Sequence, residues 1–223
     1  SPVMSRLPAA IASSPTLVRV LPFAIFAGLT SCQGVFGEVS RYWFYLFKTL
    51  SGVGMLWVVR PYIAEMKWEF TWGSLVVGVG VFGLWVGLDG LYPKLFSPGK
   101  PWNPHVEFAP SLAWLFVVVR LVGSTLIVPP LEEVFYRSFL YRYVAKPEFV
   151  SVPFNYFRWL PFLVTAVVFG LSHHQWLAGI LCACAYQGLA CWRNRLGDAI
   201  TAHAVTNFLL GGWVIWKGAW NFW

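Results

Sequence analysis

Long apolar stretches, interrupted by short polar ones, run along nearly the whole chain. A helix needs about 20 apolar residues to cross the hydrocarbon core of a bilayer. The stretches are continuous and do not alternate between apolar and polar positions, so they predict helices and not the strands of a membrane barrel. We expect an all-α polytopic membrane protein, a bundle of about eight transmembrane helices at residues 17–37, 42–59, 72–92, 111–129, 130–146, 158–173, 175–192 and 199–217.

The composition supports a membrane location. Hydrophobic residues make up 58% of the 223 positions and charged residues only 11%, whereas a soluble domain is nearer 45–50% apolar and about 25% charged. Trp and Tyr cluster near the ends of the apolar stretches, as in an interfacial aromatic belt. The net charge of +7 fits a membrane of anionic lipids. Because the basic residues are spread one or two per loop, nucleic-acid binding is not expected.

The polar loops and the cysteines add two smaller expectations. With these spans, one side carries Arg142, Lys146, Arg158, Arg193, Arg195, Arg41, Lys94 and Lys100. The positive-inside rule then places that side in the cytoplasm and the termini outside. The four cysteines have no CxxC spacing and are expected to be free buried thiols.

Two adjacent carboxylates and an arginine interrupt the apolar region at Glu132, Glu133 and Arg137. A charge at the bilayer centre costs about 2.5–3.5 kcal/mol, so such residues usually serve a function. Pro129-Pro130, just before them, predicts a helix start or a sharp kink whose free N–H groups face the glutamates. Glu133 and Arg137 stand at i and i+4 and favour an ion pair. Glu132 projects about 100° away from Glu133, so we expect it to face a cavity as a general base.

Further polar groups follow in equally apolar stretches. Phe169 and His173 are spaced i, i+4 on one helix face, which places His173 to share a water molecule with Glu132. His203 and Asn207 have the same spacing, and both can donate hydrogen bonds in one direction, as a developing oxyanion requires. A carboxylate, a histidine and two donors are the groups needed to hydrolyse an amide with water and without a covalent intermediate.

These three patterns resemble those of the CPBP family (CAAX proteases and bacteriocin-processing enzymes), the glutamate-type intramembrane endopeptidases. The family motifs EExxxR, FxxxH and HxxxN/D occur here in order, over a resemblance that covers roughly residues 111–217. The resemblance implies that Glu132 activates water with help from His173, and that His203 and Asn207 form the oxyanion hole. It implies supporting roles for Glu133, Arg137 and Phe169, and neither a cofactor nor a metal.

The resemblance also bears on organisation and partners. The sequence shows no internal repeat and no second domain, which predicts one membrane domain over residues 1–223, and the resemblance divides it into a catalytic core at 110–217 and accessory helices at 1–109. The implied substrate is a membrane-associated or lipidated protein, and the implied location is a bacterial inner (cytoplasmic) membrane, among membrane lipids. Pro129-Pro130 and Val20-Leu21-Pro22-Phe23 are most similar to a bacterial CAAX prenyl protease-related branch, often associated with exosortase systems. Exosortase-system proteins are therefore expected partners.

Other polar residues have simpler interpretations. His174 is expected to cap a helix end or to face headgroups, and Asp198 to cap the last helix. Lys48 and Arg120 are expected to reach an interface, with an ion pair to an acidic residue such as Asp89 as the alternative. One difficulty is depth: Glu132 lies near the start of one predicted helix, whereas His203 lies five residues into another that starts from the opposite side. They meet only if helices are bent or staggered, or if 111–146 is one kinked element.

Two alternative functions remain at the level of the sequence. A zinc protease would use Glu132, His173 and His203 as ligands, although the usual H-E-x-x-H helix is absent. A non-enzymatic proton-coupled carrier or a partner-binding membrane scaffold would use the same buried carboxylates and histidines. Carriers often contain two matching halves, and the sequence shows no such repeat.

Overall fold

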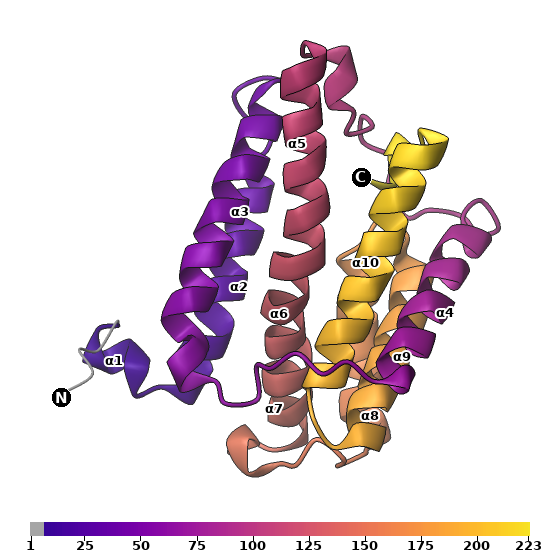
Figure 1. Cartoon of the computed structure of the whole chain (residues 1–223). Coiled ribbons are helices and arrows are strands. Elements are labelled where there is room, and N and C mark those ends of the chain that lie inside the picture. The colour runs from indigo at the N-terminus through magenta and orange to yellow at the C-terminus, as the bar shows by residue number, and fades with distance from the viewer. Residues whose placement is uncertain (1–6) are drawn as a thin grey trace.

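The computed structural model describes residues 7–223, and in this part of the chain all regular structure is helical (Figure 1). Residues 1–6 of the expected domain lie outside the described residues. The long helices are α2 (Pro15–Ser31), α3 (Ser40–Val59), α4 (Trp72–Leu88), α8 (Trp159–Leu171), α9 (Trp176–Arg193), α10 (Gly197–Lys217) and a continuous helix over Pro110–Ala145. The short elements are α1 (Ala9–Ala12) and 3-10 turns at Arg60–Tyr62, Pro104–Val106, Phe149–Ser151 and Trp220–Phe222.

The continuous helix corrects the sequence prediction at Pro129-Pro130. Its segments α5 (Pro110–Val122), α6 (Val128–Glu133) and α7 (Arg142–Ala145) are joined by π-helical turns at Gly123–Ile127 and Val134–Tyr141. In the first π turn, the backbone hydrogen bonds join residues five apart. This change of pattern lets the helix continue through two prolines that have no N–H donor. The predicted spans 111–129 and 130–146 are therefore one helix, and no helix N-terminus faces the glutamates.

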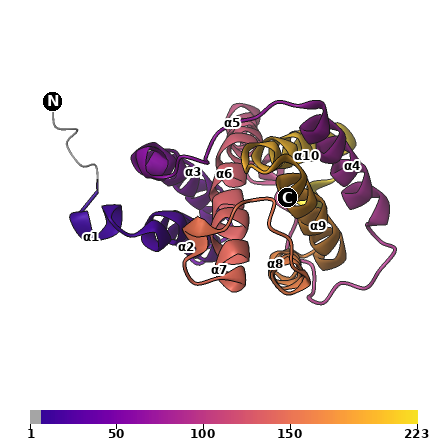
Figure 2. The same ribbon diagram turned by 90° about the horizontal axis from the view of Figure 1, so that it is seen from below.

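The continuous helix stands between two groups of helices. Seen from below, α2 and α3 lie on one side of it and α4, α8, α9 and α10 on the other (Figure 2). Within the second group, α10 packs against α4 and α9, and α8 packs against α9. By length and composition, Pro110–Ala145 and Gly197–Lys217 can each cross a membrane, and α2, α4 and α8 are shorter apolar helices. The predicted all-α fold is confirmed for the described residues, but eight transmembrane helices are not.

The expected grouping of positive loops is wrong, for the same reason. One continuous helix separates the loop before Pro110, which contains Lys94 and Lys100, from the loop after Ala145, which contains Lys146, and the two loops lie at opposite ends of that helix (Figure 1). The basic residues that the prediction placed together are thus divided between opposite ends. The orientation that was drawn from that grouping does not follow.

Two other predictions concern the ends of helices. Asp198 does not cap α10, since the N-cap position is Leu196 and carries no side-chain cap. Its carboxylate instead accepts hydrogen bonds from Thr71 (2.6 Å) and Arg195 (2.6 Å), which ties the start of α4 to the start of α10. The four cysteines are free, as predicted, but only Cys182 is fully buried.

The crossing of α8 and α9 depends on Gly170. A Cβ atom there would collide with Ile180 and would lie 2.7 Å from the carbonyl oxygen of Trp176. We expect Gly170→Ala to lower the free energy of unfolding by about 1–3 kcal/mol, the usual cost of overpacking. Denaturant unfolding in mixed micelles measures this change. Gly188→Ala in α9 is the matched control, because no atom lies within 4 Å of its added Cβ, and an equal loss in both variants would contradict the prediction.

A buried ionic cluster ties the lower ends of α2 and the continuous helix to the loop after α3. Glu65 accepts hydrogen bonds from Arg19 (2.7 Å) and from Ser138, and Arg142 lies 3.4 Å away. Burial raises the pKa of the Glu65 carboxyl, but the Ser138 hydrogen bond and the Arg19 charge outweigh burial and hold that pKa below its usual value.

The lowered pKa of Glu65 makes the stability of the protein depend on pH. A carboxyl with a lowered folded-state pKa stabilises the protein above its unfolded-state pKa, and this contribution disappears as the pH falls through the folded-state pKa. We expect the stability of the protein to fall as the pH drops below about 4.5, and Glu65→Gln to flatten the dependence in that range. Thermal unfolding from pH 7 to about pH 3 measures both; parallel curves for the two proteins would contradict the assignment.

Candidate active site

The predicted catalytic residues lie on one cavity of about 470 Å³. Glu132 reaches it from the continuous helix, His173 from the turn after α8, and His203 and Asn207 from α10. The helices at the start of the chain also line it, through residues that include Phe23, Phe26, Thr30, Tyr45 and Lys48. The N-terminal helices are thus part of the wall of the same cavity.

Glu132 and Glu133 have different environments. Glu133 is fully buried, and its Oε2 lies 3.2 Å from Nε of Arg137, as the i, i+4 spacing predicted. The side chain of Glu132 is 17% exposed and lines the cavity. Its Oε2 atom is buried and has no hydrogen-bond partner in the described structure. The two carboxylates therefore divide into a paired one inside the protein and an unpaired one at the cavity.

His203 lies between the two carboxylates, which the sequence analysis did not anticipate. Its Nδ1 is 2.8 Å from Oε1 of Glu133, and its Nε2 is 3.9 Å from Oε2 of Glu132. Because a carboxylate only accepts, Nδ1 carries the proton of this hydrogen bond. The ring also stacks on Tyr186, with centroids 5.2 Å apart. Arg137, Glu133 and His203 thus form a buried chain that fixes the imidazole and directs Nε2 towards Glu132.

Asn207 is held by a carbonyl that the prolines leave free. In the π turn, the N–H of Val128 bonds to the carbonyl of Gly123, five residues back. The next donor in that ladder would be Pro129, which has no N–H. The carbonyl of Ser124 accepts from Nδ2 of Asn207 instead, at 2.8 Å. One of the two amide hydrogens of Asn207 is therefore used to position it, and the other remains.

His173 is held by the backbone of its own helix. Its Nδ1 lies 2.7 Å from the carbonyl oxygen of Phe169, which fixes the proton on Nδ1 and leaves Nε2 as an acceptor in the neutral ring. The ring packs on Phe169 and meets the edge of Trp85. Ser172 Oγ lies 3.1 Å from the same nitrogen. The i, i+4 pair predicted from the sequence is thus joined through the Phe169 carbonyl as well as through its side chain.

Glu132 and His203, which the sequence placed at different depths, meet because of where their two helices run. Glu132 lies in the interior of the continuous helix, and α10 begins inside the protein, with residues such as Gly197, Asp198 and His203 buried. His203 therefore reaches the level of Glu132 within two turns of its helix start. The sequence left this arrangement open, because the Pro-Pro pair concealed the continuity of the helix.

Three polar residues with simpler predicted roles line the cavity. His174 lines the same cavity as His173. Lys48 is buried and also lines the cavity, as does Arg120. Asp89 forms an ion pair with Lys94 at 3.1 Å and not with either of these cations. Neither expected environment, the interface or a pair with Asp89, applies to Lys48.

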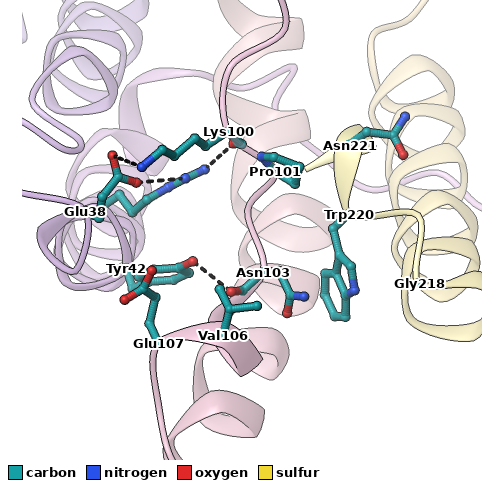
Figure 3. A pocket seen from close by; sticks show the side chains of 11 residues that line it. Glu38, Tyr42, Lys100, Pro101, Asn103, Val106, Glu107, Gly218, Trp220 and Asn221 are labelled. Carbon is teal, nitrogen blue, oxygen red and sulfur yellow. Dashed lines mark hydrogen bonds and ion pairs between the residues drawn. The ribbon is translucent and has the colours of Figure 1, made fainter.

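A second pocket, at the upper end of the molecule, has no comparable chemistry (Figure 3). There Glu38 pairs with Lys100 at 3.3 Å and with Arg41 at 3.6 Å. Arg41 also donates to the carbonyl of Lys100, and Tyr42 to that of Asn103. Glu38 thus pairs with both cations of this pocket. Within residues 7–223, no group of three His, Cys, Asp or Glu side chains lies close enough together to hold a metal ion.

Fold and site together give an all-helical protein, consistent with a membrane protein, that has a glutamate–histidine cluster beside a cavity. Residues 109–209 match the model of the type II CAAX prenyl endopeptidase Rce1-like family. This match confirms, for that part of the chain, the resemblance to the CPBP proteases drawn from the three motifs. The family supports a CAAX-type intramembrane protease in general terms. Neither the comparison with curated proteins nor that with solved structures found a similar protein.

Proposed function

We propose that the protein is a glutamate-type intramembrane endopeptidase that hydrolyses a peptide bond of a membrane-associated or lipidated protein. The observation that carries this proposal is the unpaired Oε2 atom of Glu132 on the cavity, 3.9 Å from Nε2 of an anchored His203. A general base must be free to accept a proton and must lie within hydrogen-bond reach of the water that it activates.

The proposed reaction begins when Glu132 takes a proton from water, and the resulting hydroxide attacks the carbonyl carbon of the substrate. Nε2 of His173 is an acceptor directed by the Phe169 carbonyl and helps to orient the water. The attacked carbonyl oxygen becomes an oxyanion that needs hydrogen-bond donors. The remaining amide hydrogen of Asn207 supplies one, and Nε2 of His203 supplies another when the ring carries a second proton. Glu132 then returns its proton to the leaving amine.

The supporting residues act through these groups. Arg137 neutralises Glu133, and Glu133 holds Nδ1 of His203, so that the imidazole keeps one orientation through the reaction. Phe169 packs between the two histidines, 4.5 Å from the ring of His173 and 6.2 Å from that of His203. The guanidinium of Arg137 also lies 4.7 Å from the Phe169 ring.

A comparison of peptides tests the proposal. Cells that express a Glu132→Gln variant should accumulate a membrane-associated peptide that cells with the unchanged protein cleave, and quantitative proteomics detects it. The purified protein should then cut this peptide in liposomes. Equal peptide populations in the two strains would refute the proposed activity.

Treatment with a chelator separates the proposal from the zinc alternative. Cleavage that persists in EDTA, in a preparation without stoichiometric zinc, supports activation of water by Glu132 alone. Chelator-sensitive cleavage restored by zinc would support the alternative, in which Glu132, His173 and His203 bind the metal.

A further inference from the structure

Another cavity, of about 510 Å³, lies where α3 ends and the following loop passes the continuous helix. It shares no described lining residue with the catalytic cavity. Arg60 and Lys67 are the charged residues that line it, and the other described lining residues are apolar or aromatic. We call this cavity the Arg60–Lys67 pocket. Its walls combine positive charge with a hydrophobic surface, and none of the described lining residues is acidic.

The two cations of the pocket are exposed and have no ion pair or side-chain hydrogen bond within residues 7–223. Four other arginines at this end of the molecule each pair with a carboxylate: Arg19 and Arg142 with Glu65, and Arg193 and Arg195 with Asp198. Glu69, two residues after Lys67, pairs with Arg195 at 3.4 Å. The acidic groups near the pocket are thus engaged elsewhere, and an anionic ligand could neutralise Arg60 and Lys67.

Exposed apolar side chains lead away from the pocket along two helices. Six of them, each between 47 and 61% exposed, form one stripe on each helix: Leu50, Val53 and Trp57 on α3, and Val118, Val122 and Leu126 on the continuous helix. Spacings of three, four and eight residues keep each stripe on one helix face. Trp57 and Leu126, at the lower ends of the stripes, both line the pocket. The two helices also contact each other, since Gly52 lies against Ile127.

We infer that the Arg60–Lys67 pocket binds an anionic phospholipid, with its phosphate between the two cations and an acyl chain along the apolar stripes. A guanidinium fork and an ammonium group both donate charged hydrogen bonds to phosphate oxygens. Trp57 and Trp68 line the pocket, and indole rings favour the headgroup level of a bilayer. A zwitterionic headgroup would bring a cation for which the pocket offers no acidic partner. A free phosphate ion would leave the stripes uncovered.

The continuous helix forms a wall between this pocket and the catalytic cavity. Ser124 and Val128 line the catalytic cavity, whereas Leu126 and Pro130 line the Arg60–Lys67 pocket. The π turn Gly123–Ile127 thus contacts both, and the carbonyl of Ser124 in this turn holds Asn207 at 2.8 Å. A lipid packed against Leu126 would restrain the turn and, through it, Asn207. We therefore expect the lipid to raise the rate of hydrolysis, a consequence that rests on the function proposed above.

The test measures lipid binding directly and requires no cleavage. The purified protein, exchanged into micelles without phospholipid, is titrated with phosphatidylglycerol or with phosphatidylcholine that has the same acyl chains. Native mass spectrometry counts the bound lipids and gives the Kd of the first one. A cation near an anionic lipid contributes about fivefold in affinity, so phosphatidylglycerol should bind about 10- to 30-fold more tightly. Equal affinities for the two lipids would overturn the inference.

The variants locate the effect in the pocket. Arg60→Gln and Lys67→Gln should each lower the ratio of the two affinities about fivefold, and the double variant should bring it close to one. The double variant Lys146→Gln/Arg158→Gln is the matched control, because it removes two exposed cations outside the pocket. It should keep the full ratio. If the control lowers the ratio as much as the pocket variant does, the preference is a general effect of charge and the inference is wrong.

Two further outcomes separate the ligand sources and the two proposals. If glycerol phosphate competes as well as the intact lipid does, the pocket binds a soluble anion and the apolar stripes have no role, which would overturn the lipid assignment. If lipid preference depends on Arg60 and Lys67 but a Glu132→Gln protein keeps full activity, the lipid site is supported and the proposed hydrolysis fails.

Discussion

Replacing Glu132 by glutamine is expected to lower the rate of peptide hydrolysis by about 100- to 10,000-fold, the range that a general base contributes. Glutamine keeps the size of the side chain, but its amide cannot accept a proton from water. Because Oε2 of Glu132 has no hydrogen-bond partner in the described structure, the substitution breaks no hydrogen bond of that atom. The fold should be retained, so the loss should appear in kcat and not in the yield of folded protein.

Single-turnover cleavage of the substrate peptide in proteoliposomes measures this effect. Glu148→Gln is the control, since Glu148 is exposed in the loop after α7 and should leave the rate unchanged. A Glu132→Gln protein with full activity would remove Glu132 from the mechanism and with it the proposed class of protease.

Replacing Arg137 by methionine is expected to act on stability first. Arg137 and Glu133 are both fully buried and form an ion pair at 3.2 Å. Removing one partner leaves the other as an uncompensated buried charge, which typically costs about 3–5 kcal/mol. Without its arginine, Glu133 should also lose its fixed contact with Nδ1 of His203, so the remaining folded protein should cleave slowly.

Unfolding in mixed micelles, followed by tryptophan fluorescence, measures the change in stability. The double variant Glu133→Gln/Arg137→Met removes both charges and should recover part of the lost free energy. It should not recover activity, because the glutamine cannot anchor His203 as a carboxylate does. Arg158→Met, at an exposed position, is the control. A double variant that is less stable than Arg137→Met would contradict this account.

The predictions for Glu132→Gln and Arg137→Met give different roles to the neighbouring residues Glu132 and Glu133. Glu132 and Glu133 have the same side chain and adjacent places in the sequence. Their helical positions turn one towards the cavity and the other towards Arg137 and His203. A lower rate of hydrolysis in Glu132→Gln and a lower free energy of unfolding in Arg137→Met would show that the two glutamates have different functions.

The residue pattern alone determined the helical class, the cavity-facing place of Glu132 and the ion pair of Glu133 with Arg137. These features follow from the lengths of apolar stretches and from the helical periodicity, which are local properties of the chain. The same periodicity put Phe169 beside His173 and His203 near Asn207.

Only the tertiary structure decided where separate helices meet. Pro129-Pro130 indicates a helix break by local rules, but a π turn carries the helix through it, and the carbonyl freed by Pro129 holds Asn207. The contact between Glu133 and His203 spans 70 positions of the chain, and the placing of Lys48 beside the catalytic cavity depends on the packing of α3. Local spacing cannot predict such contacts, because they arise from the way in which whole helices pack.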